Sequence, residues 1–290
     1  MKVFAEPLIE NFCINRISHA LKDYAPENIK FVGKEEGANL VIHFVHGHRK
    51  RVWWKICRLK EKGCNSAIVQ LQLKDTANPE TKDWLEIWEN SKLTWSYYNL
   101  PQICIDEGTP TKFNFYHAPL GVDGDKFKDF DLERNYIIGI HSKGWSRESM
   151  REVVAAAREV GKTVLNFEDE KDYGEGVEYT GRIKDNDLKM AYHYSKCKYV
   201  SGLRRPEGFE LPVIEGLMCG ARPIVFDLPC YRQWYDGLAE FIPSEGRAVI
   251  IPALVELFKK DPKPVTEEEK ELVKEKFNWE KIARGFWKRI

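Results

Sequence analysis

RPEGFELPVIEGLMCGARPIVFD, residues 205–227, decides the fold of the second half of the chain. Gly208 frees the backbone, and Pro212 suits the first turn of a helix whose apolar residues follow at spacings of three and four. Gly220 is a typical helix end, and residues 223–226 are a short apolar run that predicts a buried strand. The stretch therefore predicts a loop, a helix and a buried strand, in that order.

Two carboxylates, Glu207 and Glu215, lie on either side of the predicted helix start. The first turn of a helix has backbone N–H groups without helical partners, so it attracts anions such as phosphate. A carboxylate beside a bound phosphate can accept hydrogen bonds from hydroxyl groups. This combination is typical of a sugar-nucleotide site. The alternative is a solvated carboxylate and a helix-start charge that the helix dipole favours.

The composition indicates a globular protein without an overall charge preference. The chain has 290 residues, 43% of them hydrophobic, and its 45 basic and 45 acidic residues cancel. This length suits two domains of about 130–160 residues each. The overall charge favours neither nucleic acid nor membrane as a partner, so only local patches could do so.

The cysteines and the hydropathy of the chain indicate a cytoplasmic setting. Seven cysteines are an odd number, and no CxxC pair occurs among them. We therefore expect reduced, structural cysteines and no metal site. We also expect no signal peptide and no transmembrane segment, because no apolar run approaches the required length.

Strands and helices alternate along the chain, which predicts an α/β fold of parallel sheets with helices on their faces. The first series has expected strands at 2–5, 38–45, 66–73 and 93–97, and expected helices at 14–24, 51–62 and 84–88. The charged residues 125–134 are typical of a linker. The second series has expected strands at 136–141, 163–167, 199–203 and 223–226, and expected helices at 149–160, 187–195, 249–258, 267–277 and 279–290.

Three segments of the second half resemble, in order, the nucleotide-sugar-binding domain of GT-B glycosyltransferases, and most closely the retaining enzymes of glycosyltransferase family 4. YTGRIKDNDL, residues 179–188, is similar to the family's strand, glycine turn and helix. Residues 207–215 have its Glu-x7-Glu spacing. CGARPIVFD, residues 219–227, is similar to its C-G-x-P-V-V segment, with one extra residue before the proline. Residues 115–123 resemble its inter-domain element, and residues 277–283 resemble its last helix.

The resemblance implies the GT-B fold, in which two Rossmann-like domains face each other across a cleft that closes for transfer. It implies an acceptor-side domain at residues 1–128, a donor-binding domain at 129–275 and a C-terminal helix at 276–290 that packs back on the first domain. The implied activity is transfer of a hexose or pentose from a nucleoside diphosphate sugar, UDP-sugar foremost, with retention of configuration. No cofactor and no metal are implied, because basic side chains replace a metal cation.

The same resemblance implies roles for individual residues. Glu215 would hold the ribose hydroxyls, and Glu207 would lie beside the donor sugar. The backbone at 208–211 would face the sugar and diphosphate, and the turn at 181–183 would lie against the base. The implied nucleotide-binding residues are thus Gly208, Phe209, Glu210, Leu211, Glu215, Gly181, Arg182 and Ile183.

The chain departs from the family at several positions. It lacks the family's Arg-x4-Lys pair of diphosphate-binding cations, so we assign this role to Arg147 first and Lys143 second, with ordinary helix-entry charges as the alternative. His46 ends an apolar strand at the edge where ligands of open α/β sheets bind, and it is our candidate catalytic histidine; a structural histidine is the alternative. Glu210 stands where the family commonly has glycine.

The acceptor is left open among a modified DNA base, a lipid and a saccharide. The short first domain is typical of small enzymes that viruses encode, some of which glycosylate modified bases in DNA. Residues 49–62 are basic with two tryptophans, which fits lipid headgroups, nucleic-acid phosphates or simply a solvated helix face. The turn at residues 7–13 lacks the family's usual glycines. With the imperfect cation pair, this leaves a non-catalytic sugar-nucleotide-binding protein as the alternative to an enzyme.

Overall fold

A computed structural model describes residues 1–6, 12–45, 49–72, 81–110, 112–145, 148–183, 186–205 and 208–290. Three residues predicted to act in catalysis, His46, Arg147 and Glu207, lie outside these described residues. By its contacts the chain divides into two compact units. Unit 1 comprises Met1–Leu120, Pro206–Phe209 and Trp279–Ile290, and unit 2 comprises Gly121–Arg205 and Glu210–Asn278.

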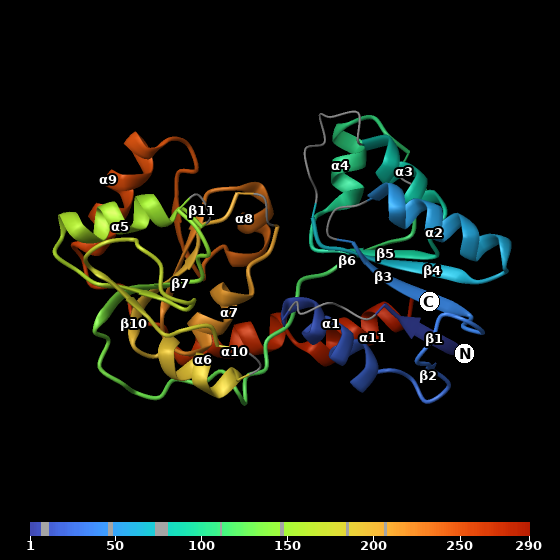
Figure 1. The fold of residues 1–290 in the computed structure, drawn as a ribbon, viewed down its shortest axis with the longest axis horizontal. Coiled ribbons are helices and arrows are strands. Elements are labelled where there is room, and N and C mark those ends of the chain that lie inside the picture. The colour runs from blue at the N-terminus through green and yellow to red at the C-terminus, as the bar shows by residue number, and fades with distance from the viewer. Residues whose placement is uncertain are drawn as a thin grey trace. The chain divides into compact units, whose positions relative to one another are not determined.

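Unit 1 is built on a parallel sheet with the strand order β2-β1-β3-β4-β5-β6. Its strands are β1 (Lys2–Ala5), β2 (Lys30–Phe31), β3 (Leu40–Val45), β4 (Asn65–Gln70), β5 (Leu93–Ser96) and β6 (Phe115–His117). Its helices are α1 (Phe12–Asp23), α2 (Arg49–Glu61), α3 (Thr81–Glu89), α4 (Leu100–Asp106) and α11 (Trp279–Trp287). α2 packs with α3, and α1 packs with α11 (Figure 1).

The last helix, α11, is bound to the rest of unit 1 by buried polar contacts. The Trp287 indole donates a hydrogen bond to Leu21 O at 2.9 Å, and Tyr116 Oη donates to Ile282 O at 2.9 Å. Ile282 and Phe286 of α11 are also buried. The end of the chain therefore completes the core of the unit that its beginning forms.

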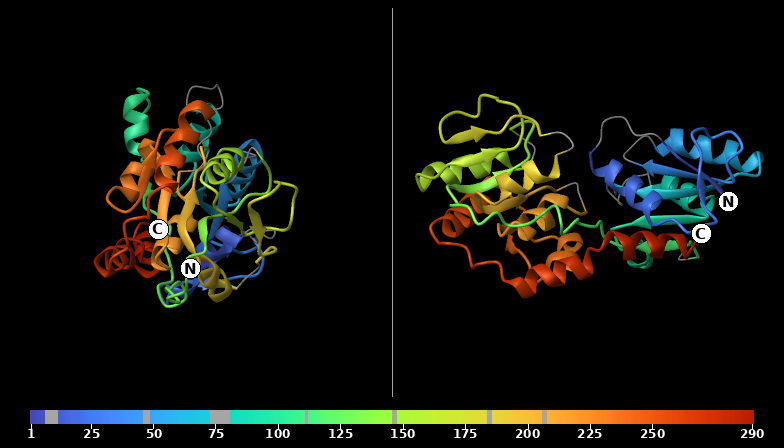
Figure 2. Two further views of the ribbon diagram at one scale, coloured as in Figure 1. Left: turned by 90° about the vertical axis from the view of Figure 1, so that its left-hand side faces the viewer. Right: turned by 90° about the horizontal axis from the view of Figure 1, so that it is seen from below.

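Unit 2 is built on a second parallel sheet, with the strand order β12-β11-β10-β7-β8-β9. Its strands are β7 (Tyr136–Ile140), β8 (Val164–Asn166), β9 (Val177–Tyr179), β10 (Cys197–Gly202), β11 (Arg222–Phe226) and β12 (Glu240–Ile242). Its helices are α5 (Met150–Glu159), α6 (Asp187–Tyr194), α7 (Leu211–Met218), α8 (Pro229–Tyr235), α9 (Arg247–Phe258) and α10 (Glu267–Lys276). α5 packs with α9, while α7 packs with α6 and α10 (Figures 1 and 2).

The helix predicted from the opening stretch, α7, lies very close to β10. A Cβ atom on Gly216 would come within 2.5 Å of Val200 Cγ1, so only glycine allows this approach. The helix ends at Met218, and Gly220 follows with a φ of 79°, a left-handed conformation that glycine adopts without strain. The strand predicted next is β11, which is buried throughout. The predicted helix and strand are therefore present in the predicted order.

Residues 125–134, which the sequence analysis interprets as a linker, pack against unit 2. Phe127 is buried, and the Arg134 guanidinium donates to Cys197 O at 2.8 Å and to Cys219 O at 3.1 Å. Arg134 thus satisfies carbonyl groups at the start of β10 and after the end of α7. The segment is therefore part of the packing of unit 2 rather than a free connection, because Phe127 is buried and Arg134 is hydrogen-bonded there.

Candidate functional site

The strand order of unit 2 reverses between β7 and β10, which are neighbours at the middle of the sheet. From β7 the chain continues through α5 to β8 on one side, and from β10 it continues through α7 to β11 on the other. Both helices therefore begin at the carboxyl edge of the sheet, beside this reversal. Ligands of open α/β sheets bind at such a point, which makes this edge the candidate site.

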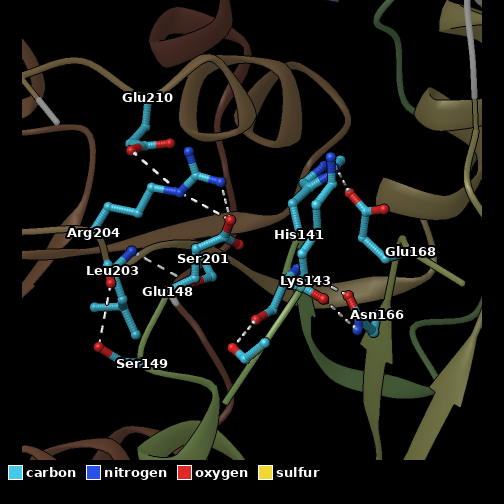
Figure 3. A network of polar contacts seen from close by, with 12 residues as sticks. His141, Lys143, Glu148, Ser149, Asn166, Glu168, Ser201, Leu203, Arg204 and Glu210 are labelled. Atoms are coloured by element: carbon cyan, nitrogen blue, oxygen red, sulfur yellow. Dashed lines mark hydrogen bonds and ion pairs between the residues drawn. The ribbon is translucent and has the colours of Figure 1, made fainter. Parts of the chain in front are cut away.

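Arg204 lies at this edge between two acidic side chains (Figure 3). It follows β10, and its Nε donates to Glu148 Oε1 at 2.9 Å, the same oxygen to which its Nη2 donates. Its Nε also lies 3.9 Å from Glu210 Oε1. Glu148 comes just before α5, and Glu210 is the N-cap residue of α7. One guanidinium group thus links the segments that enter both helices.

The Glu148 carboxyl group is unusual in its burial and its backbone. Only 5% of its side chain is exposed, whereas 35% of the Arg204 side chain is exposed. Burial raises the pKa of Glu148 to about 7, although Arg204 opposes this by favouring the charged form. Glu148 and Ser149 have φ values of 52° and 53°, which residues other than glycine rarely adopt. A strained backbone that holds a buried acid with a shifted pKa is typical of functional sites.

Glu215, predicted to hold the ribose, is a buried residue of α7 with an exposed fraction of 3%. Its Oε2 accepts a hydrogen bond from Tyr194 Oη at 3.4 Å. Tyr194 Oη also lies 2.8 Å from His141 Nε2, so side chains from α6, α7 and the end of β7 form one polar chain. A buried carboxylate of this kind can accept hydrogen bonds from two neighbouring hydroxyl groups.

The turn predicted to lie against the base follows β9 at the same edge of the sheet. Gly181 has a φ of 70°, and a Cβ atom there would meet no described atom within 4 Å. The Arg182 N–H donates to Asp169 Oδ1 at 3.0 Å, which ties the turn to the segment after β8. Ile183 is half-buried. The turn therefore offers backbone groups and an aliphatic side chain, the surfaces that a planar base requires.

The other predicted residues differ in how the structure places them. Lys143 is half exposed at the carboxyl end of β7, with its Nζ 3.9 Å from Glu168 Oε1. Glu210 is buried, and its N–H already donates to Tyr235 Oη at 2.8 Å. Leu211 is the buried first residue of α7. Gly208 and Phe209 are grouped with unit 1 by their contacts.

Arg204 and Glu148 are functional candidates that the sequence analysis did not identify. Arg204 follows an apolar strand almost directly, which is a usable signal, because the residues after such a strand lie at the ligand-binding edge. Glu148 carried no comparable signal, since it is one of many acidic residues in charged loops. Its importance depends on burial, which only the fold reveals.

Two further observations concern metals and membranes. In the part of the chain that the structure describes, His, Cys, Asp and Glu side chains form no group of three or more that could hold a metal ion. Among the described residues, no helix is both long enough and apolar enough to span a membrane.

The comparisons with known proteins concern the fold. No protein-family model and no curated protein matches the chain. Among solved structures, Anabaena HepE in complex with UDP matches with a TM-score of 0.72 and 11% identity, over 99% of this chain and 98% of that chain. Sucrose-phosphate synthase from Thermosynechococcus elongatus matches with a TM-score of 0.68 and 15% identity, over 88% of this chain and 73% of that chain. The pneumococcal O-GlcNAc transferase GtfA, in complex with UDP and GlcNAc, matches with a TM-score of 0.63 and 16% identity, over 86% of this chain and 56% of that chain.

The chain therefore has the GT-B fold of these glycosyltransferases, with one six-stranded parallel sheet in each unit. The fold class predicted from the sequence is confirmed.

Proposed function

We propose that the protein transfers a sugar from a nucleoside diphosphate sugar, with UDP as the nucleotide, to an acceptor hydroxyl. One observation carries the proposal: the starts of α5 and α7, a guanidinium group and a buried carboxylate meet at the strand reversal of unit 2. The helix starts and the guanidinium suit a diphosphate, and the carboxylate suits ribose hydroxyls. HepE and GtfA, which share the fold, have structures in complex with UDP.

In this proposal each group of residues has a separate role. Glu215 binds the ribose, the turn at 181–183 contacts the base, and the backbone at 208–211 faces the sugar and diphosphate. Within that backbone the Glu210 N–H contributes less, because Tyr235 Oη already accepts its hydrogen bond. Glu207 is placed beside the donor sugar by its sequence motif alone.

The remaining assignments rest on sequence resemblance. Arg147 and Lys143 are proposed to bind the diphosphate, and His46 is proposed to lie near the donor sugar. We also propose that the enzyme is of the family 4 type and that side chains rather than a metal ion supply the positive charge. Lys143 is at the carboxyl edge of unit 2, which agrees with its proposed role.

The proposed reaction exchanges one bond at sugar C1 for another. The bond from C1 to the diphosphate oxygen breaks, a bond from C1 to the acceptor oxygen forms, and the acceptor hydroxyl loses its proton. Negative charge grows on the leaving diphosphate. Cations and N–H groups that are already in position stabilise this charge without having to reorganise. We propose that the configuration at C1 is retained, as the Glu-x7-Glu resemblance implies.

The acceptor proposal depends on helix α2 of unit 1. Trp54 is 67% exposed, and Lys50 and Arg58 lie one helical turn before and after it, both exposed. Cations around an exposed indole fit an acceptor carried on an anionic surface, either lipid headgroups or DNA phosphates. Binding to DNA that weakens steeply as salt is added favours DNA, because phosphate contacts release counter-ions. A saccharide acceptor that is free in solution, rather than attached to a lipid or to DNA, requires no such cationic surface.

Turnover of a panel of nucleoside diphosphate sugars tests the proposed activity. We expect at least one donor, a UDP-sugar first, to release free nucleotide slowly even without an acceptor, because water can replace the acceptor in an incompletely closed site. Chromatography of the nucleotides measures this release. A donor that binds without being turned over, across the whole panel, would identify the protein as a non-catalytic sugar-nucleotide-binding protein instead. Absence of binding to every donor would contradict both readings.

A further inference from the structure

We propose that Arg204 binds the diphosphate of the donor, and that Glu148 serves as its counter-ion until the donor arrives. This inference rests on the proposed function and adds two residues to its donor site. Neither residue belongs to the Glu-x7-Glu motif or to the expected cation pair.

The position of Arg204 suits phosphate binding. The residue follows β10 at the strand reversal, and its side chain reaches the segments that enter α5 and α7. The first turn of a helix attracts anions, because its N–H groups have no partners within the helix. Its Nε and Nη2 contact Glu148, and Figure 3 shows the third nitrogen directed away from that carboxylate. The backbone is held as well, because Tyr231 Oη donates to Arg204 O at 2.7 Å. A planar guanidinium held in this way can meet a phosphate with fixed geometry.

The neighbouring cation, Arg205, makes structural contacts within unit 2. Its Nε donates to Ser244 O at 3.0 Å, and its guanidinium lies 4.6 Å from the centroid of the Phe226 ring. Stacking on an aromatic ring and a backbone hydrogen bond fix Arg205 against unit 2. Arg204, which pairs with the Glu148 carboxylate at the strand reversal, is therefore the better candidate for an incoming anion.

The groups around Glu148 determine how its charge responds to an anion. The groups that act on it directly are His141 and Arg204, from the ends of β7 and β10, and Glu168 and Tyr173, from the segment after β8. Further out, Lys143 Nζ lies 3.9 Å from Glu168 Oε1, and Glu210 Oε1 lies 3.9 Å from Arg204 Nε. Burial and the charge of Glu168 raise the pKa of Glu148, whereas Arg204 and a hydrogen bond from the backbone N–H of His141 lower it. A bound diphosphate adds negative charge and occupies Arg204, and both changes raise the pKa of Glu148 above about 7.

Donor binding should therefore be coupled to protonation of Glu148. Below about pH 7 the carboxyl group is already neutral in the free protein and opposes the diphosphate little. Above that pH the free protein carries the charge, so binding takes up a proton and the affinity falls as pH rises. A counter-ion of this kind keeps Arg204 in place in the empty site and gives up its charge when the diphosphate replaces it.

Calorimetric titration with UDP tests the inference on the full chain. At about pH 6 we expect Glu148→Gln to bind UDP about as tightly as the unmodified protein, and at about pH 8 roughly 10-fold more tightly, because the competing charge is gone. Arg204→Ala should bind UDP roughly 10- to 100-fold more weakly at both pH values. The terminal phosphate of UDP titrates near pH 6 for every variant, so ratios between variants cancel it.

A matched control separates this effect from a general loss of positive charge. Lys259→Ala removes an exposed cation after the C-terminal end of α9, and we expect unchanged UDP affinity. If Arg204→Ala does not fold, Arg204→Lys keeps the charge but loses the planar fork, and it should weaken binding roughly 3- to 10-fold.

Two results would overturn the inference. One is UDP binding by the Arg204 variant within about twofold of the unmodified protein; the other is weaker binding by Glu148→Gln at about pH 8, which a purely structural ion pair predicts. Either result, with UDP still bound by the unmodified protein, leaves the proposed function intact. If the unmodified protein binds no UDP, the inference and the proposed donor both fail.

Discussion

Replacement of Glu215 by alanine is expected to weaken UDP binding about 10- to 100-fold, the range for loss of hydrogen bonds to a charged group. Glu215 is buried in α7, and its carboxylate accepts a hydrogen bond from Tyr194 Oη at 3.4 Å; a carboxylate has two oxygens that can accept further hydrogen bonds. Ribose hydroxyls are proposed to be those donors. UDP titration of the unmodified and variant proteins at one pH measures the change.

The control for this prediction is Tyr194→Phe, which removes one hydrogen bond to Glu215 and leaves the carboxylate in place. We expect this variant to bind UDP within about threefold of the unmodified protein, since the ribose contact remains. If Glu215 instead has only a structural role, Glu215→Gln should lower the melting temperature and leave the UDP affinity unchanged. That pattern would contradict the ribose assignment.

Replacement of Arg222 by methionine is expected to lower the free energy of unfolding by about 3–5 kcal/mol, because it leaves a mostly buried carboxylate without its partner. The Arg222 side chain is only 4% exposed, and its Nη1 and Nη2 donate to Glu269 at 2.7 and 2.9 Å. It also donates to Lys263 O and Pro264 O, so one side chain fastens α10 and the segment before it to β11. Urea denaturation measures the loss.

Lys198→Met provides the matched control, because Lys198 on β10 pairs with the largely exposed Asp261. We expect that change to cost less than about 1 kcal/mol. The double variant Arg222→Met/Glu269→Gln should have a free energy of unfolding about 1 kcal/mol or more above that of Arg222→Met alone, since no charge is then left unpaired. Equal losses from Arg222→Met and Lys198→Met would show that the Arg222 contacts contribute little.

The same ion pair predicts the direction of the pH dependence. Burial acts to raise the pKa of Glu269, but the hydrogen bonds from Arg222 and from the Thr266 N–H, together with the charges of Arg222 and Lys263, outweigh it, and the pKa lies below its usual value. The stability from ionised Glu269 is therefore fully present above the unfolded pKa and is lost as pH falls below it. The difference in stability between the unmodified protein and the Glu269→Gln variant should shrink in acid.

The elements that the sequence predicts well are those whose pattern is local. The apolar runs of β3, β4, β10 and β11 mark buried strands, and proline and glycine mark the ends of α7. Five short elements of the described chain, which have two to seven residues each, follow from no pattern in the sequence: β2, α4, β6, α8 and β12. The strand β9 is expected only through the resemblance of residues 179–188 to a strand, glycine turn and helix. Such segments are too short to show a period, and their conformation depends on the neighbouring strand. β2, for example, is defined by two residues that pair with β1.

The candidate site was predictable in part for the same reason. The motif that contains Glu215 is continuous in sequence, so its helix and the adjacent edge could be located before the fold was known. The Arg204–Glu148 pair joins residues 56 positions apart, and it exists because β7 and β10 are neighbours. No local pattern encodes that adjacency. The assignments of His46, Arg147 and Glu207 stay predictions, because these residues lie outside the described part of the chain.

The position of the nucleotide in a crystal structure of the protein with UDP decides whether the donor site is at this edge. We expect the diphosphate at the strand reversal of unit 2, within about 3 Å of the Arg204 guanidinium and beside the start of α7. We expect the ribose hydroxyls to contact Glu215. A nucleotide bound away from this edge, or bound there with its ribose remote from Glu215, would contradict the proposed donor site.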